Sequence, residues 1–281
     1  MQATFSYCAE LVRTADRDRF LATLFAPVGS RDALYALYAF NIEISRVADR
    51  AREAMPGEIR LQWWRDVLHG ERGEEAGASP VAAALLNTLE RRRLAADSLI
   101  ALVEARRFDL YNEPMLTVAG LESYAVRTSS ALIAMAAQIL GVDAAAAARP
   151  AGIGYGFAYA LAALPRQAAQ RKLYLPVELL ARHGAGPDDV FSGRSSPRLN
   201  AAAAELRSLA RGYLDATAAA LGTLSDETWP AFLPVAPLRA VLDRWERCDI
   251  FAPAELSAWR RQWLIWRASR NLVRNLTRVA G

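Results

Sequence analysis

The chain has 281 residues, 53% hydrophobic and 23% charged, so it is long enough and apolar enough to bury a sizeable globular core. Its net charge is only +4, no apolar run approaches the roughly 18–20 residues of a membrane span, and residues 1–20 lack the basic and apolar regions that predict a secretory signal. Cys8 and Cys248 have no His or Cys nearby, which argues against a zinc site or a disulfide framework and favours a cytoplasmic protein.

Helical periodicity dominates the chain, and no segment shows the sustained alternation that predicts a β-strand. The predicted helices lie, in chain order, at about 5–26 (one or two helices), 30–54 with Ser30 as N-cap, 56–68, 80–111 (two helices), 122–140, 144–164, 198–221, 237–251 and 254–279. Turn-rich stretches at about 70–80 and 184–197 are predicted loops. Because no repeat and no low-complexity linker divides the sequence, we predict one all-α domain over residues 1–281.

The predicted helix at 30–54 carries a polar group near its end. Ser45 and Asp49 are spaced at i,i+4 and Arg46 and Asp49 at i,i+3, so all three side chains share one neighbourhood on a helix. Acidic residues at the first two positions would form a carboxylate cluster suited to Mg²⁺. The chain has a hydroxyl and a cation there instead, so this segment by itself does not predict a metal site.

Three segments together resemble the squalene/phytoene synthase family. They are Tyr35 to Asp49, the run Gly57-Glu58-Ile59-Arg60-Leu61-Gln62-Trp63-Trp64-Arg65, and Leu173-Tyr174-Leu175-Pro176. The resemblance implies an all-α, single-domain isoprenoid-synthase-like fold around a central cavity. It also implies that active relatives join two allylic diphosphates, using two aspartate-rich motifs on facing helices that hold Mg²⁺.

This chain departs from the acidic pattern that the resemblance implies. The first motif falls on Ser45, Arg46 and Asp49, of which only Asp49 is acidic. The second should lie just before Leu173, yet no Asp or Glu occurs from Ala144 to Val177. Mg²⁺ that neutralises a leaving diphosphate needs several carboxylates or retained waters. We therefore predict no catalytic residue, no metal-binding residue and no cofactor, with Mg²⁺ required only if the chain is an active enzyme.

Basic residues occupy the positions near both expected motifs. Arg46 lies within the first, and Arg166, Arg171 and Lys172 lie near the second. A cation beside a metal position opposes Mg²⁺ binding by several kcal/mol at short range. Two interpretations stay open for these arginines, because a guanidinium can also stabilise phosphoryl oxygens in place of a metal.

The form Ala39-Phe40-Asn41-x-Glu43, followed by the Gly57 to Trp64 run, is similar to a divergent subgroup of the family. That subgroup contains a mitochondrial complex I assembly factor and bacterial relatives, and it also lacks the aspartate motifs. The resemblance implies a non-catalytic role in respiratory complex assembly, with partners among the complex subunits and the inner membrane surface. An active prenyltransferase and a carrier of an isoprenoid or other lipid are the alternatives.

The candidate binding residues are polar or aromatic side chains expected to line a remnant of the family's cavity. They are Asn41, Ser45, Arg46, Asp49, Arg60, Trp64, Tyr124, Thr128, Arg166 and Tyr174. Each also has a structural interpretation. Glu43, Arg46 and Asp49 would form an ion-pair ladder on a solvated helix face. Asn41 would be a satisfied core amide near Ser45.

The last predicted helix repeats tryptophan at i,i+4,i+7, namely Trp259, Trp263 and Trp266. Arginines are predicted on the opposite side, at positions 260, 267, 270, 274 and 278. The pattern favours a core-facing aromatic stripe with a solvated basic face, and a helix lying on an anionic membrane surface is the alternative. Nucleic-acid binding is not predicted, because no recognised module is present and acidic residues balance most of the charge.

Overall fold

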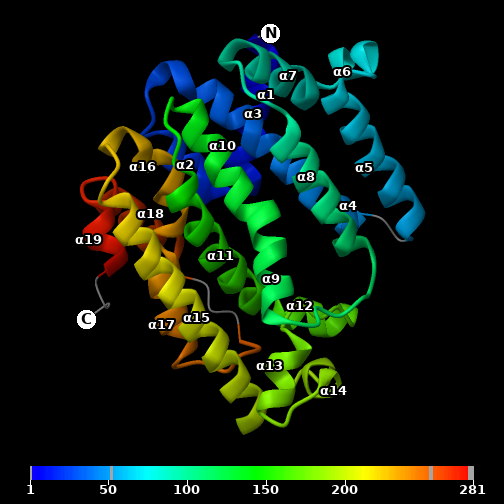
Figure 1. Cartoon of the computed structure of the whole chain (residues 1–281), viewed down its shortest axis with the longest axis vertical. Coiled ribbons are helices and arrows are strands. Elements are labelled where there is room, and N and C mark those ends of the chain that lie inside the picture. Colours follow the sequence, from blue (N-terminus) through cyan, green and yellow to red (C-terminus); the bar gives the residue numbers. More distant parts are fainter. Residues whose placement is uncertain (1, 51–52, 253–255, 278–281) are drawn as a thin grey trace. The chain divides into compact units, whose positions relative to one another are not determined.

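The computed structural model describes residues 2–50, 53–252 and 256–277. Its regular elements are helices, and no residue in these ranges lies in a β-strand, which confirms the predicted all-α class (Figure 1). The chain divides into two compact units, which we describe one at a time. The described parts of Met1–Tyr111, Ala131–Ala145 and Ser225–Pro234 form unit 1, and those of Asn112–Ser130, Ala146–Leu224 and Val235–Gly281 form unit 2. One domain over residues 1–281 stays a prediction.

Unit 1 is built around a central buried helix, α3, which contacts α1, α2, α7, α8 and α10. The α-helices of this unit are α1 (Gln2–Ala15), α2 (Arg17–Thr23), α3 (Val28–Ser45), α4 (Val47–Arg50), α5 (Ala54–His69), α6 (Gly73–Ala78), α7 (Pro80–Arg92), α8 (Asp97–Arg106), α10 (Ala131–Ile139) and α16 (Trp229–Phe232). The short 3₁₀ segments are η1 (Arg107–Leu110) and η3 (Asp226–Thr228).

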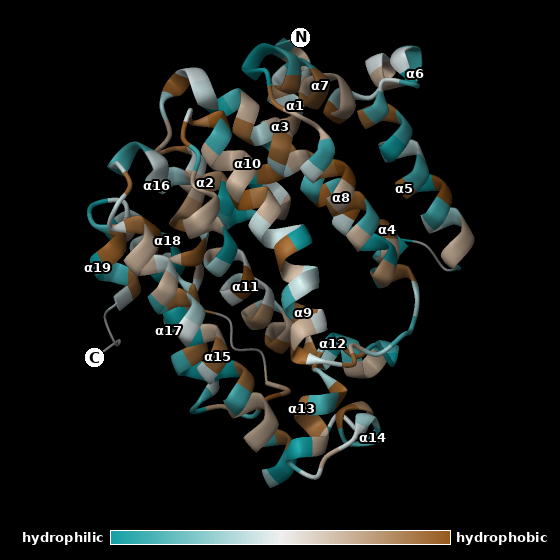
Figure 2. Ribbon diagram, in the orientation of Figure 1, coloured by the Kyte–Doolittle hydropathy of each residue, from teal (hydrophilic) through white to brown (hydrophobic). Residues whose placement is uncertain are grey.

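The burial of α3 follows from its composition. Every residue from Ala33 to Ile42 is at most 8% exposed, and ten consecutive buried residues cover all sides of the helix. A helix that is apolar nearly all round must be enclosed by other helices. Figure 2 shows apolar residues along most of α3, whereas α5 alternates between apolar and polar residues.

Both ends of α3 differ from the prediction. The helix begins at Val28 after Pro27, and Ser30 accepts a hydrogen bond from Arg92 instead of capping the helix. It ends at Ser45, where the Ser45 hydroxyl donates to the Ile42 carbonyl at 3.1 Å. Arg46 lies in a turn, and α4 then begins at Val47. A serine bonded back to its own helix bends the backbone and competes with regular hydrogen bonding, which accounts for the interruption.

The predicted loop at 70–80 contains α6, so that prediction is wrong. The break from α5 occurs where expected, because Gly70 adopts a left-handed conformation with φ 82°. Polar contacts between the end of α5 and the start of α6 then order the following residues, and a local sequence pattern does not contain those contacts.

Unit 2 has α15 as its longest helix, in contact with α13, α17 and α19. The α-helices of this unit are α9 (Val118–Ala125), α11 (Ala145–Ala162), α12 (Leu164–Gln170), α13 (Val177–Arg182), α14 (Pro187–Phe191), α15 (Pro197–Leu221), α17 (Leu238–Trp245), α18 (Ala258–Ala268) and α19 (Leu272–Thr277). The short segment η2 (Val126–Ser130) is a π-helix, and η4 (Leu233–Val235) is a 3₁₀ segment at the boundary of the units. The predicted loop at 184–197 is interrupted by α14.

The predicted helices of this unit are confirmed in part. The helix expected at 144–164 is α11, and the one expected at 198–221 is α15. The helix expected at 122–140 is divided into α9, η2 and α10. Wider π-helical turns are common at functional sites, and periodicity does not reveal them.

The core-facing interpretation of the C-terminal tryptophans is wrong. Trp259, Trp263 and Trp266 are 75%, 43% and 48% exposed, while Ile265 and Ala268 provide the buried side of α18. A helix with both aliphatic and aromatic stripes can turn either one inward, and here the aliphatic stripe is buried. The helix expected at 254–279 is also broken between α18 and α19. Residues 254, 255, 278 (an arginine) and 279 of this prediction lie outside the described residues.

Candidate functional site

The segment on which the resemblance places the first aspartate-rich motif lies at the junction of α3 and α4. Ser45 and Arg46 are half-buried and Asp49 is exposed. Ser45 uses its hydroxyl within α3, on Ile42, and not on Asn41, which is buried in the same helix. A single carboxylate next to a guanidinium and a committed hydroxyl is a poor donor set for Mg²⁺, which requires near-octahedral oxygen coordination.

No group of three or more His, Cys, Asp or Glu side chains within residues 2–50, 53–252 and 256–277 is placed to hold a metal ion. The resemblance places the first acidic motif on Ser45, Arg46 and Asp49 and the second just before Leu173, and Asp49 is the one acid among these positions.

Glu43 of α3 pairs with Arg60 of α5, and not within the ladder predicted on its own helix. The Arg60 Nη2 lies 2.9 Å from the Glu43 Oε2, and the two side chains are 44% and 20% exposed. Arg60 also lies over the rings of Trp63 and Trp64, at 4.3 and 5.8 Å from their centroids. Arg60, a candidate for lining the cavity, thus contacts one carboxylate and two aromatic faces.

Trp64, another candidate for lining the cavity, is a core residue of unit 1. It has no exposed surface, and its ring packs edge-on against Phe40 at 4.9 Å. Its Nε1–H has no hydrogen-bond acceptor among the residues that the structure describes. The neighbouring Trp63 is half-buried and donates its Nε1–H to Glu75 at 2.8 Å. Of the two adjacent tryptophans, one packs in the core and the other joins a surface network.

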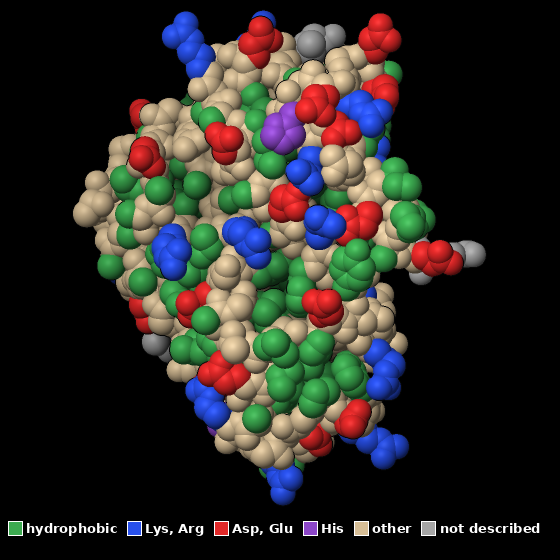
Figure 3. All heavy atoms as spheres, turned by 45° about the vertical axis from the view of Figure 1, so that its right-hand side comes forward, with side chains coloured by type: hydrophobic (Ala, Val, Ile, Leu, Met, Phe, Trp, Pro, Cys, Tyr) green, Lys and Arg blue, Asp and Glu red, His purple; other side chains and the backbone are tan. Residues whose placement is uncertain are grey.

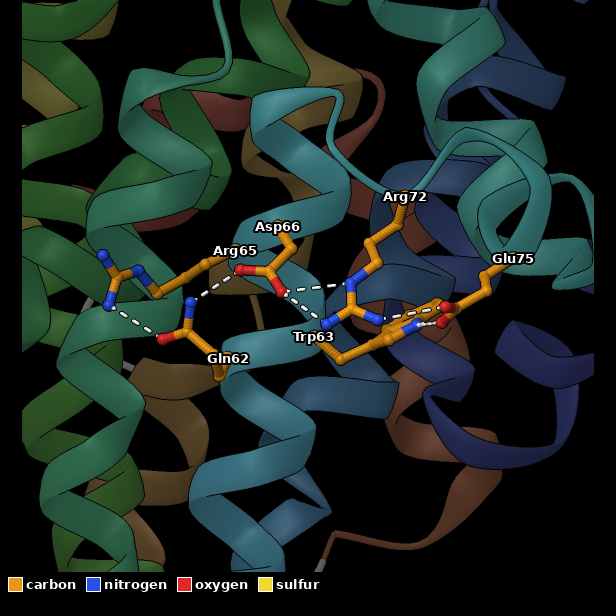
Figure 4. Close-up of polar contacts among 6 residues, drawn as sticks. All are labelled: Gln62, Trp63, Arg65, Asp66, Arg72 and Glu75. Atoms are coloured by element: carbon orange, nitrogen blue, oxygen red, sulfur yellow. Dashed lines mark hydrogen bonds and ion pairs between the residues drawn. The ribbon is translucent and has the colours of Figure 1, made fainter.

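A network of polar side chains connects α5 to α6, and Figure 4 shows how they converge. Arg72 donates to Asp66 from Nε at 3.1 Å and from Nη2 at 3.0 Å, and its Nη1 donates to Glu75 at 3.0 Å. Gln62 donates to the other oxygen of Asp66 at 2.6 Å. Hydrogen bonds from Gln62 and then Arg72 lower the pKa of Asp66 below its usual value. The bond from Trp63, followed by that from Arg72, likewise lowers the pKa of Glu75.

The other end of α5 contacts η1. Glu58 accepts a hydrogen bond from the Tyr111 hydroxyl at 2.8 Å and pairs with Arg107 at 2.9 Å. Gly57 leaves room for Leu110, whose Cδ2 would lie 2.4 Å from a Cβ at position 57. Seen from the α5 side, acidic and basic side chains lie close together on the surface (Figure 3).

The run Gly57 to Arg65 therefore serves structural contacts in this chain. Arg65, its last residue, pairs with Glu104 of α8 at 2.6 Å. The helix predicted at 56–68 is α5, but the sequence did not reveal the partners of this run. The sequence analysis did not identify the network of Asp66, Arg72 and Glu75. Its one sequence signal is the spacing of opposite charges, with Arg72 six residues after Asp66 and three before Glu75.

The candidate binding residues of unit 2 are Tyr124 on α9, Thr128 in the π-helical segment η2, Arg166 on α12 and Tyr174. The Thr128 hydroxyl is buried and donates to the Tyr124 carbonyl at 2.7 Å. The Tyr124 ring meets Tyr174 edge-on at 5.9 Å. Arg166, on α12, is exposed and donates to the Tyr159 hydroxyl at 3.0 Å. Tyr124, Thr128 and Tyr174 thus form one aromatic and hydroxyl group, while Arg166 contacts a different tyrosine.

Backbone contacts fix the segment that carries Tyr174. The Met115 N–H donates to the Leu173 carbonyl at 2.8 Å, and the Val177 N–H donates to the Met115 carbonyl at 2.9 Å. The run Leu173 to Pro176 is held between these two bonds. The resemblance identified this run. Its position is fixed by backbone pairing with Met115, nearly sixty residues earlier in the chain.

A close helix contact positions η2 itself. Gly152 of α11 faces Ser130, and a Cβ at position 152 would lie 2.1 Å from the Ser130 backbone nitrogen. The Ser130 hydroxyl donates to the Arg149 carbonyl at 2.8 Å. Nearby, the Tyr213 hydroxyl donates to Glu122 at 2.6 Å; burial and then this bond raise the pKa of Tyr213 to about 12. Sequence reasoning missed Tyr213 and Glu122, which are distant in the chain.

A model of the squalene/phytoene synthase family matches residues 12–267. The chain belongs to the squalene/phytoene synthase family. This result confirms the family that the sequence resembled. The segments on which the resemblance places the two aspartate-rich motifs lie inside the matched range.

Relatives in this family differ in what their names describe. The chain is 29% identical over 256 residues to human NADH dehydrogenase (ubiquinone) complex I assembly factor 6, covering 89% of this chain and 77% of that protein. It is 24% identical over 283 residues to a 15-cis-phytoene synthase of Synechococcus elongatus, covering 93% of this chain and 91% of that protein.

Solved structures confirm the isoprenoid-synthase fold. A dehydrosqualene synthase matches with a TM-score of 0.85 at 17% identity, covering 96% of this chain and 97% of that one. A squalene synthase from Alicyclobacillus acidocaldarius matches with a TM-score of 0.76 at 21% identity, covering 87% and 94%. At these identities the likeness concerns the fold alone.

Proposed function

We propose that this chain is a non-catalytic member of the squalene/phytoene synthase family that acts in the assembly of respiratory complex I at the membrane. One observation carries the proposal: the segments that match the two aspartate-rich motifs contain only Asp49 as an acid. The similarity to complex I assembly factor 6 of human and other animals supports the role in assembly. The partners would be complex I subunits, and the location would be cytoplasmic, peripheral to the inner membrane.

The physical reason is the charge of the leaving group. Ionising an allylic diphosphate leaves a polyanion that must be neutralised as it departs, and Mg²⁺ held by carboxylates does this in metal-dependent enzymes. Ser45 and Arg46 supply no carboxylate, and the stretch from Ala144 to Val177 supplies none either. Arg60, the nearest candidate for a replacement cation on α5, is engaged by Glu43.

Deleting the gene in the organism of origin tests the assembly role. We expect less assembled NADH dehydrogenase on native gels stained for NADH oxidation, with succinate dehydrogenase unchanged as the internal control. Re-expression of the wild-type chain should restore the complex. Normal amounts of assembled NADH dehydrogenase in the deletion strain would refute the proposal.

An active prenyltransferase is the second candidate, because the chain matches a phytoene synthase over nearly its whole length. In this case Arg46 and Arg166 would stabilise the diphosphate oxygens. Purified protein is incubated with farnesyl or geranylgeranyl diphosphate, with and without Mg²⁺, beside an active phytoene synthase. We expect no pyrophosphate release and no condensed product; turnover by the wild-type chain would establish the enzyme and overturn the non-catalytic proposal.

A lipid or isoprenoid ligand is compatible with the assembly role, since Tyr124, Thr128 and Tyr174 combine aromatic surface with hydroxyls. Extraction of the purified protein followed by mass spectrometry tests for a bound isoprenoid. A Tyr124→Ala variant that loses the lipid while keeping its circular dichroism would support a lipid site in unit 2. Equal lipid content in the two proteins would count against it.

A further inference from the structure

The helix α18 exposes a row of large aromatic side chains. Trp259, Trp263 and Trp266 are 75%, 43% and 48% exposed and follow one another at i,i+4,i+7. The row extends for about 10 Å along the helix axis. Exposing three tryptophans on one short helix leaves apolar surface in contact with water, which is unfavourable unless another surface covers it.

Arginines lie on the same face as the tryptophans, and not opposite them as the sequence predicted. The Arg267 guanidinium lies over the Trp263 ring at 5.1 Å, and that of Arg270 lies over Trp266 at 5.4 Å. Arg260 is exposed beside Trp259. Seen along the helix axis, the tryptophans form the centre of this face and Arg260 and Arg267 one edge of it.

The helix that carries this face, α18, and the adjoining helix α19 have no acidic residue of their own. No Asp or Glu occurs from Leu256 to Thr277, which includes all of α18 and α19. Helix α15 lies beside α19 within unit 2 and also contacts α17 (Figure 1). The acids of α15 and of the segment around α17 contact partners outside α18 and α19: Glu205 with Arg182 and His183, Asp215 with Arg239, Asp243 and Glu246 with Arg211, and Asp249 with Ser195.

We propose that the exposed face of α18 docks on a lipid bilayer that carries anionic headgroups. Tryptophan rings partition to the boundary between headgroups and acyl chains, while guanidinium groups reach the phosphates. The positive charge of the face complements an anionic bilayer. No described helix is long and apolar enough to cross a membrane, so contact along the surface is the mode that α18 supports.

Two other occupants of this face are less compatible with its charge. A second copy of the chain in a two-fold dimer would bring the face of α18 against itself, so that Arg260, Arg267 and Arg270 would lie close to the arginines of the other copy. A protein partner would need a complementary acidic groove for a convex helix. A bilayer supplies the negative charge and the apolar layer together.

Vesicle flotation tests the proposal with the full chain. We expect binding to vesicles of phosphatidylcholine and phosphatidylglycerol, weak binding to phosphatidylcholine alone, and a decrease as salt is raised. A triple variant with Arg260→Gln, Arg267→Gln and Arg270→Gln should bind the anionic vesicles on the order of a hundredfold more weakly, at about fivefold for each arginine. Quenching of tryptophan fluorescence by brominated lipid should also disappear in a variant with Trp259→Ala, Trp263→Ala and Trp266→Ala.

The matched control removes the same charge elsewhere: Arg17→Gln, Arg91→Gln and Arg194→Gln are exposed positions in other parts of the chain. This control should bind vesicles like the wild type, and all variants should keep the wild-type circular dichroism. Absence of wild-type binding to anionic vesicles, or equal losses in the α18 arginine variant and the control, would overturn the proposal. If both α18 variants bind vesicles as strongly as the wild type but no longer bind a purified complex I subunit, this face would be assigned to a protein partner instead. The inference concerns a surface and is independent of the proposed role in assembly.

Discussion

The substitution Gly152→Ala probes the contact that positions η2. A new Cβ would lie 2.1 Å from the Ser130 backbone nitrogen and 2.3 Å from its Cα and Oγ, distances below the 3.0 Å that real Cβ atoms respect. The nearest atoms belong to the backbone, so a rotamer change cannot relieve the clash. Helix α11 or η2 would have to move by about 1 Å in a densely packed interior.

Two effects of opposite sign set the magnitude. Alanine is favoured over glycine in a helix interior by about 1 kcal/mol. Overpacking costs about 1–3 kcal/mol when side chains can adjust, and more when they cannot. Since Ser130 presents its backbone to Gly152, we take a cost of about 3 kcal/mol or more, which leaves a net destabilisation of about 2 kcal/mol or more.

Gly212 provides the matched control in the same unit. It lies inside α15, and a Cβ added at this position would have no atom within 4 Å, so Gly212→Ala keeps the propensity gain without a clash. We expect this variant to be more stable by about 1 kcal/mol. Urea unfolding followed by far-ultraviolet circular dichroism measures both free energies of unfolding, with the denaturant slope confirming that the unfolded surface is unchanged.

Equal gains in stability for the two variants would refute the reasoning. Such a result would mean that Gly152 is not in close contact with Ser130. The placement of Thr128 and Tyr124, which depends on the path of η2, would then be wrong as well. A loss for Gly152→Ala with a gain for Gly212→Ala is the outcome that the structure predicts.

Three further predictions concern unit 1. Trp64→Ala should lower the free energy of unfolding by about 3–5 kcal/mol and Trp63→Ala by clearly less, as measured by urea unfolding, because only Trp64 is fully buried; equal losses would contradict this. A double-mutant cycle on Glu43 and Arg60 should give a coupling of at most about 1 kcal/mol that decreases with salt, since both side chains are partly exposed; a larger, salt-independent coupling would be inconsistent with a solvated pair. The lowered pKa of Asp66 means that its contribution to stability is present above the unfolded value of about 3.9 and is lost as the pH falls through the lower folded value. Acid titration of unfolding should therefore be less steep for Asp66→Asn than for wild type, and identical acid profiles would refute that contribution.

The sequence predicted the features that depend on composition over many residues. The lack of sustained alternation predicted an all-α chain, and no residue in the described ranges lies in a β-strand. The acid-free stretch before Leu173 likewise needed no structure to be recognised. These properties are unchanged by small differences in helix ends or side-chain direction, which is why the all-α class could be predicted. The family and its fold were predicted from the resemblance carried by Tyr35 to Asp49, Gly57 to Arg65 and Leu173 to Pro176.

Contacts between distant residues were beyond the sequence pattern. Helix α6 is stabilised by contacts with Asp66 and Trp63 of α5. Because a local sequence pattern does not show such contacts, the segment was predicted to be a loop. The tryptophans of α18 were assigned to the core because an i,i+4,i+7 spacing defines a stripe without showing which way it faces. The direction is decided by Ile265 and Ala268, which pack inward in the folded unit.

The retained and the lost residues of the family motifs have different physical roles. The Gly57 to Arg65 run serves packing and ion pairs, with Gly57 making room for Leu110 and Arg60 joining α5 to α3. Folding requires these contacts whether or not a reaction takes place. A metal cluster, by contrast, gathers like charges that destabilise the folded state until the metal neutralises them. Ser45 and Arg46, where the resemblance places aspartates, carry no negative charge and add no such repulsion. A chain with the proposed structural role would need the first set of residues and not the second.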